Sequence, residues 1–105
     1  MTIYALSSGP GLSGVAVIRI SGSETEKVIL FLTKQNLPIP RVATLRKILN
    51  IDSKELIDEG IIIWFPGPNS YTGENMAELH VHGSKAVIQS ILDNISKIKN
   101  CRLAE

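Results

Sequence analysis

The chain has 105 residues, a formal net charge of +1 and one cysteine. This length suits one domain, 1–105, and an apolar fraction of 44% excludes a disordered chain. The 11 Lys and Arg residues form no cluster, so composition gives no argument that this segment binds nucleic acid directly. The longest apolar run, 61–65, is too short to span a bilayer, and the first residues lack signal-peptide features. We therefore expect a cytoplasmic protein that does not associate with membranes.

The first 22 residues predict two strands separated by a turn-rich loop. Residues 3–8 are a short apolar stretch, and residues 15–20 are rich in β-branched side chains. Residues 9–14, Gly-Pro-Gly-Leu-Ser-Gly, break the pattern between them. Alternation along the second strand places Arg19 on one face and Ile18 on the other. Because an arginine on an apolar strand face needs a partner, we expect Arg19 to meet either a nearby carboxylate or a ligand.

A helix is predicted to follow. Ser23 and Glu26 have the spacing of a capping box, which predicts a helix that begins at Ser23. Pro38 and Pro40 cannot continue the helical hydrogen bonds and should end it.

The remainder of the chain predicts three strands and a second helix. The strands cover 42–51, 56–65 and 76–82, with a loop at 66–73, and the helix covers 84–98. Residues 101–105 can begin one more strand. Strands and helices do not alternate regularly, so we expect an α+β fold with a mixed or mostly antiparallel sheet of about five strands and two helices.

The glycine-rich loop at 9–14 is a candidate nucleotide site by its spacing. Gly9 and Gly14 have the spacing of a phosphate-binding loop, but Val15 and Ala16 stand where Lys and Ser or Thr are required. The loop also leads into a predicted strand and not into a helix. A tight turn is the better interpretation.

Three ionisable residues should share one face of the strand 76–82, namely Glu78, His80 and His82. A His-x-His pair can bind zinc, although the only additional distant candidate ligand is Cys101. Glu78 can instead accept hydrogen bonds from the N–H groups of a polar ligand. Tyr71, in the preceding loop, can pack on a flat ligand or on a partner chain.

Three segments together resemble one family, the tRNA modification GTPases called MnmE or TrmE. They are GVAVIRISG at 14–22, Asp-Glu-Gly at 58–60 continuing to WFPGPNSYTGE at 64–74, and ELHVHG at 78–83. The second is long and unusual, and the resemblance extends over essentially the whole chain. It implies that residues 1–105 are the N-terminal domain of a longer protein, in which a helical domain and an inserted GTPase domain follow.

The resemblance also implies a function. The fold should be similar to folate-binding domains of the aminomethyltransferase type, and the domain should form a homodimer. The expected ligand is a tetrahydrofolate derivative, 5-formyl- or methylene-tetrahydrofolate, which serves as one-carbon donor. The full-length protein would act on tRNA with a flavin-dependent partner enzyme at C5 of the wobble uridine. GTP, Mg²⁺ and K⁺ would bind only in the GTPase domain, so this chain is not expected to be catalytic alone.

Carried over by residue, Arg19 and Glu78 match folate-contacting positions of the family, and Tyr71 and His80 are further candidates. No catalytic or metal-binding residue is assigned in this chain, and a further folate-contacting lysine is expected beyond Glu105. Two positions depart from the family pattern. The loop 9–14 lacks the arginine of the usual Pro-Pro-Gly-Arg-Gly-Gly, and Ser84 replaces a glycine.

Two alternatives remain open. The chain can be a dimerisation scaffold with an incomplete pocket, or a small metal-binding protein that uses His80 and His82.

Overall fold

The computed structural model describes residues 1–7 and 14–104. The described residues form six strands and two helices, an α+β fold as predicted. In chain order the elements are β1 (Thr2–Leu6), β2 (Val15–Ser21), α1 (Thr25–Thr33), β3 (Thr44–Leu49), β4 (Leu56–Phe65), β5 (Met76–His82), α2 (Lys85–Ser96) and β6 (Cys101–Leu103).

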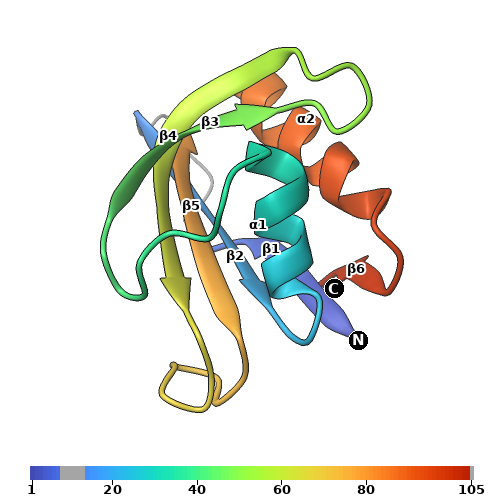
Figure 1. The fold of residues 1–105 in the computed structure, drawn as a ribbon. Helices are drawn as coiled ribbons and strands as arrows, with labels where there is room; N and C mark the ends of the chain where they lie inside the picture. Colours follow the sequence, from blue (N-terminus) through green and yellow to red (C-terminus); the bar gives the residue numbers. More distant parts are fainter. Residues whose placement is uncertain (8–13, 105) are drawn as a thin grey trace.

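All six strands belong to one mixed sheet with the order β3-β4-β5-β2-β1-β6. Every neighbouring pair is antiparallel except β1 and β6, which run parallel. The sheet has one strand more than the approximate prediction because residues 101–103 pair with β1 beside the start of the chain (Figure 1).

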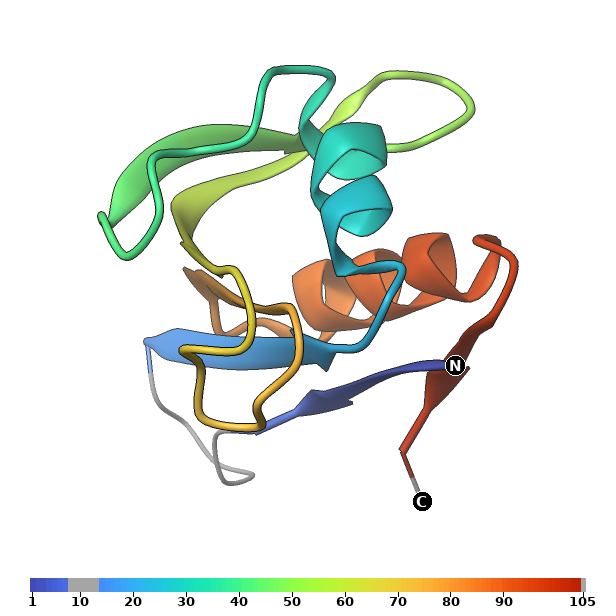
Figure 2. The same cartoon turned by 60° about the horizontal axis from the view of Figure 1, so that its bottom comes forward.

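Both helices lie on the same side of the sheet, which curves around them (Figures 1 and 2). The core consists of apolar side chains from alternate strand positions and from the inner faces of the helices, including Ile18, Leu79, Leu32, Ile91 and Ile95, all of them fully buried. The apolar periodicity predicted for residues 84–98 is thereby confirmed. The opposite face of the sheet carries no helix, and the predicted functional residues of β2 and β5 lie on it.

The predicted capping box is wrong. The structure places the N-cap of α1 at Glu24, and no side chain of that residue caps the helix. The backbone N–H of Glu24 instead donates to the hydroxyl of Thr2 in β1, at 2.6 Å. The first turn is thus held by a side chain from a distant strand, which local sequence spacing cannot reveal. At α2, which was expected to start at residue 84, Ser84 is the N-cap and its side chain accepts from the N–H of Val87.

Candidate functional site

The helix-free face of the sheet brings Arg19 and Glu78 together. Because β2 and β5 pair antiparallel, the two residues lie directly opposite each other in the register. The guanidinium Nη2 of Arg19 donates to Oε2 of Glu78 at 2.8 Å. The Glu78 side chain is 17% exposed and that of Arg19 is 38% exposed. The pair is therefore partly shielded from water, which strengthens its attraction relative to a surface ion pair.

His80 extends this pair into a chain of three polar side chains. Its Nε2 lies 3.1 Å from Oε1 of Glu78, so the carboxylate is contacted at both oxygens. Burial by itself would raise the pKa of Glu78, but the hydrogen bonds from Arg19 and His80 outweigh it and lower that pKa below its ordinary value. Glu78 is consequently a charged acceptor at neutral pH, as the prediction of a ligand-binding carboxylate requires.

Tyr71 lies beside the linked side chains of Arg19, Glu78 and His80. It belongs to the loop between β4 and β5, which projects beyond the end of the sheet (Figure 1). The guanidinium carbon of Arg19 lies 5.6 Å from the centre of the Tyr71 ring, within cation–π range. The ring itself is 86% exposed. The loop is attached to β2 through Ser21, whose hydroxyl bonds to Thr72 at 2.8 Å and to Glu74 at 3.2 Å. The structure thus brings together all four predicted contact residues, Arg19, Glu78, His80 and Tyr71.

This arrangement leaves bonding capacity for a ligand. The Nε of Arg19 is buried and has no hydrogen-bond partner among the described residues. Each oxygen of Glu78 holds one internal donor, and a carboxylate oxygen can accept a second. A flat ligand with N–H groups can therefore pair with Glu78 while it packs against the exposed ring of Tyr71.

His82 does not belong to this chain of contacts, although it shares the strand face. Its ring Nδ1 lies 2.7 Å from Oδ1 of Asp58, and its backbone N–H donates to Oδ2 of the same carboxylate at 2.9 Å. Burial tends to raise the pKa of Asp58, but the hydrogen bonds from His82 and from the backbone of Glu59 lower it overall. The pairing of Asp58 with His82 was not predicted from the sequence, where Asp58 was only part of a motif. It depends on the antiparallel pairing of β4 with β5, which brings residues 58 and 82 to the same end of the two strands.

A groove of about 420 Å³ lies on the helix-free face beside His82. Its lining combines apolar side chains of three strands, Val15, Leu45 and Ile61, with the polar groups of Glu59, His80 and His82.

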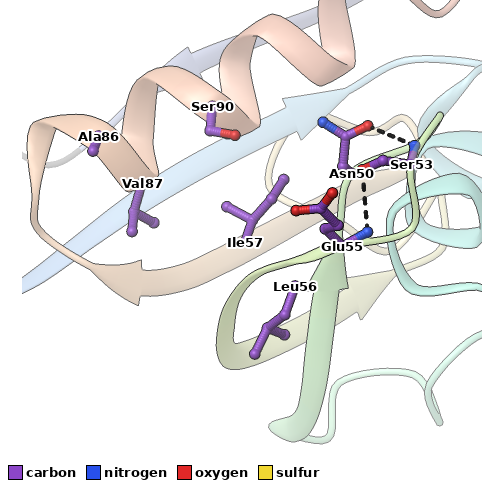
Figure 3. Close-up of a pocket in the computed structure, with 8 residues that line it drawn as sticks. All are labelled: Asn50, Ser53, Glu55, Leu56, Ile57, Ala86, Val87 and Ser90. Atoms are coloured by element: carbon purple, nitrogen blue, oxygen red, sulfur yellow. Dashed lines mark hydrogen bonds between the residues drawn. The ribbon is translucent and has the colours of Figure 1, made fainter.

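A second cavity, of about 290 Å³, lies between the β3–β4 turn and the start of α2 (Figure 3). Asn50 and Ser53 contribute polar groups to its wall, but these groups already hold the turn. Asn50 accepts from the N–H groups of Asp52 and Ser53, and the hydroxyl of Ser53 accepts from the N–H of Glu55. This cavity has none of the predicted site residues, and we assign no ligand to it.

The remaining sequence hypotheses concern the loop 9–14, a metal site at His80 and His82, Cys101, and a membrane-spanning segment. The loop 9–14 lies outside the described residues except for Gly14, whose carbonyl accepts from the N–H of Gly83 at 3.1 Å. His80 and His82 bond to different carboxylates, and the described residues contain no group of three ligands that could hold a metal ion. Cys101 is half-buried, and burial raises the pKa of its thiol. Neither helix of the described residues has the length and apolarity needed to cross a membrane.

Comparison with known proteins gives a consistent result. Residues 2–105 match the family described as GTP-binding protein TrmE N-terminus. The chain is 69% identical over 105 residues to the tRNA modification GTPase MnmE of Pelagibacter ubique, covering 100% of this chain and 24% of that protein. It is 50% identical over 104 residues to the mitochondrial 5-taurinomethyluridine-[tRNA] synthase subunit GTPB3 of Danio rerio, covering 99% of this chain and 21% of that protein. The chain therefore spans about a quarter of the length of these relatives.

Proposed function

Because this chain belongs to the family described as GTP-binding protein TrmE N-terminus, we propose that it forms the folate-binding and homodimerisation domain of a cytoplasmic tRNA modification GTPase. The parent protein would modify the wobble uridine of tRNA at C5 together with a flavin-dependent enzyme. GTP, Mg²⁺ and K⁺ would bind outside residues 1–105. The names of the relatives support this assignment. They include a tRNA modification GTPase and a subunit of a synthase for 5-taurinomethyluridine in tRNA.

The observation that carries the folate proposal is the contact chain of Arg19, Glu78 and His80 beside the exposed ring of Tyr71. The aminopyrimidine edge of a pterin offers adjacent N–H donors, and an ionised carboxylate is the acceptor that matches them. Tyr71 supplies an aromatic surface on which a flat ring can pack. The guanidinium of Arg19 adds a permanent positive charge for the polar edge or the carboxylated tail of the ligand.

The homodimer proposal has separate support. The face of the sheet that lacks helices exposes large apolar side chains from three strands, Ile3, Val15 and Leu45, which are between 39% and 58% exposed. Val15 and Leu45 line one groove, whereas Ile3 lies beside Ser21 at the opposite end of β2. Exposed apolar side chains on a bare sheet face are suited to burial against a partner. A second copy of the chain on this face would place the folate site at or near the interface between the two copies.

The folate proposal is tested by calorimetric titration with 5-formyltetrahydrofolate, on this chain and on a version that continues beyond Glu105. We expect weak binding to residues 1–105 and tighter binding to the longer protein, which would contain the missing lysine. Glu78→Gln should weaken binding by about 10-fold or more, because a hydrogen bond to a charged group contributes about 1.5–3 kcal/mol. Glu26→Gln, on the exposed surface of α1, is the matched control. Equal affinity of Glu78→Gln and the wild type would refute the assignment of Glu78.

The alternative function is a dimerisation scaffold with an incomplete pocket, and the exposed apolar face is the observation that favours it. Sedimentation of the chain with and without folate separates the two functions. A dimer whose stability and sedimenting mass are the same with and without saturating folate favours the scaffold.

A further inference from the structure

The two histidines of the chain are held in opposite orientations by two different carboxylates. His80 approaches Glu78 with Nε2, whereas His82 approaches Asp58 with Nδ1. An ionised carboxylate only accepts hydrogen bonds, so the ring nitrogen that faces it must carry the proton. His80 is therefore expected to carry its proton on Nε2 and His82 on Nδ1. In the neutral ring of His82, Nε2 is left as an acceptor with a free lone pair.

Asp58 is well built for orienting the ring. Its side chain is only 10% exposed, while that of His82 is 73% exposed. The carboxylate accepts both the backbone N–H and the ring Nδ1–H of His82, which fixes the ring relative to the end of β5. Nε2 has no hydrogen-bond partner among the described residues, and the ring lines the groove on the helix-free face. A carboxylate that holds one imidazole nitrogen and leaves the other open is the arrangement used in general bases.

The groove beside the ring has the composition of a ligand site. Val15, Leu45 and Ile61 offer an apolar surface from three different strands, and its volume of about 420 Å³ falls in the range of small-molecule pockets. The polar groups on its wall are Glu59, His80 and His82. All of them can accept a hydrogen bond in their unprotonated forms, and the lining contains no lysine or arginine.

We propose that this groove binds a planar, largely apolar group that carries an N–H or O–H donor, and that Nε2 of His82 accepts the proton of that donor with Asp58 as its positioning residue. The site adjoins the Arg19–Glu78 pair, because His80 contacts Glu78 and also lines the groove. Val15 and Leu45 belong to the face that the homodimer proposal covers, so in such a dimer the groove would lie at the interface. His82 lies four residues beyond Glu78 along β5, which separates the two by about 13 Å at the usual rise of a strand. The proposal does not depend on folate being the ligand of the Arg19–Glu78 pair.

The variant Asp58→Asn tests the role of the carboxylate with little change in shape. Its amide oxygen can still accept the backbone N–H of His82, while its NH₂ group faces Nδ1 as a donor. The bracing contacts are kept, but the proton of His82 must move to Nε2, which then no longer accepts. A merely structural pair would tolerate this exchange without any consequence for reactivity.

The tautomers are read directly by long-range ¹H–¹⁵N correlation spectra, recorded as the pH is raised until the imidazole signals no longer change. We expect the Nδ1–H form for His82 and the Nε2–H form for His80 in the wild type. Asp58→Asn should convert His82 alone, and Asp52→Asn, an exposed aspartate that pairs with Lys97, should change neither. Observation of the Nε2–H form of His82 in the wild type would overturn the proposal.

Proton acceptance is tested with 4-nitrophenyl acetate, whose ring is a planar probe for the groove. Nε2 of His82 would take a proton from water as the water oxygen bonds to the acyl carbon, and the ester C–O bond would break. Acetate and 4-nitrophenolate would be released, and the proton on His82 would pass to solvent. We expect hydrolysis above the buffer rate in the wild type and in the control Asp52→Asn, and a loss of about 10-fold or more of that excess in His82→Gln and Asp58→Asn. A wild-type rate equal to buffer, or an unchanged rate in Asp58→Asn with the tautomer reversed, would overturn the proposal. If folate does not bind but the tautomer and hydrolysis results are as expected, only the proposed function is refuted.

Discussion

Gly60 of β4 packs directly against the backbone of β5, and its replacement by alanine gives the sharpest test of the packing described above. A Cβ atom at this position would lie 2.3 Å from the backbone carbonyl oxygen of His80 and 3.2 Å from a methyl group of Val81. The first distance is more than 1 Å short of the 3.4 Å at which ordinary van der Waals contact begins. The obstacle is backbone in a central pair of strands, so no side-chain rotation can relieve it.

Relief therefore requires the two strands to separate locally. Overpacking in a rigid interior destabilises by about 1–3 kcal/mol, and disturbance of the strand hydrogen bonds adds to this, so we expect Gly60→Ala to lower the free energy of unfolding by about 3 kcal/mol or more. At about 4 °C per kcal/mol for a domain of this size, the melting temperature should fall by about 12 °C. Because the clash involves His80, the chemical shifts of both histidines should move as well.

Two other glycines are matched controls for this substitution. A Cβ at Gly14 or at Gly73 would meet nothing within 4 Å. Gly73 has a φ of +80°, so alanine there should lower stability by about 1 kcal/mol through backbone strain alone. Gly14→Ala should be nearly neutral. Urea denaturation followed by circular dichroism ranks the three variants, and a loss for Gly60→Ala no greater than that for Gly73→Ala would refute the steric argument.

Two further predictions concern buried polar groups. Asn94 is 2% exposed, and its side-chain oxygen accepts the backbone N–H of Ile51 at 2.8 Å. Asn94→Ala leaves that N–H without a partner and should lower the free energy of unfolding by about 2 kcal/mol in urea denaturation; an unchanged midpoint would show that the bond contributes nothing. Glu78 has a pKa lowered by Arg19 and His80 against the opposing effect of burial, so its contribution to stability is present above its unfolded-state pKa and is lost as pH falls through its folded pKa. The melting temperature should accordingly fall less steeply between about pH 5 and pH 3 in Glu78→Gln than in the wild type, and parallel profiles would contradict this assignment.

The local pattern of the sequence was sufficient to predict which residues share a face. Strict alternation in 15–20 and 76–82 placed Arg19 with Val17, and Glu78 with His80, on the side opposite the apolar core, and the burial of both strands agrees. This succeeds because the side-chain period of a strand is a local property of the backbone. The same holds for the 3.6-residue period of α2, whose large apolar side chains all belong to the core or pack against it.

Register and long-range pairing were decided by the tertiary structure. Arg19 and Glu78 are separated by 59 residues, and only the pairing of β2 with β5 places them opposite each other. The same cause explains the wrong capping box, because the first turn of α1 is held by Thr2 from another strand. The strand suggested for residues 101–105 is present as β6, and its parallel partner β1 was decided by the tertiary structure. A local pattern contains no information about which strand becomes a neighbour.

The contrast is clearest for the histidines. Sequence alone determined that His80 and His82 lie on one strand face with Glu78. It did not determine that they would be held by different carboxylates, because that depends on where β4 brings Asp58 against the end of β5. Residue types and their spacing thus supplied the chemical groups of this face. The order and register of the strands, which bring distant segments within hydrogen-bond range, decided which groups became partners and which nitrogen of each ring was left open.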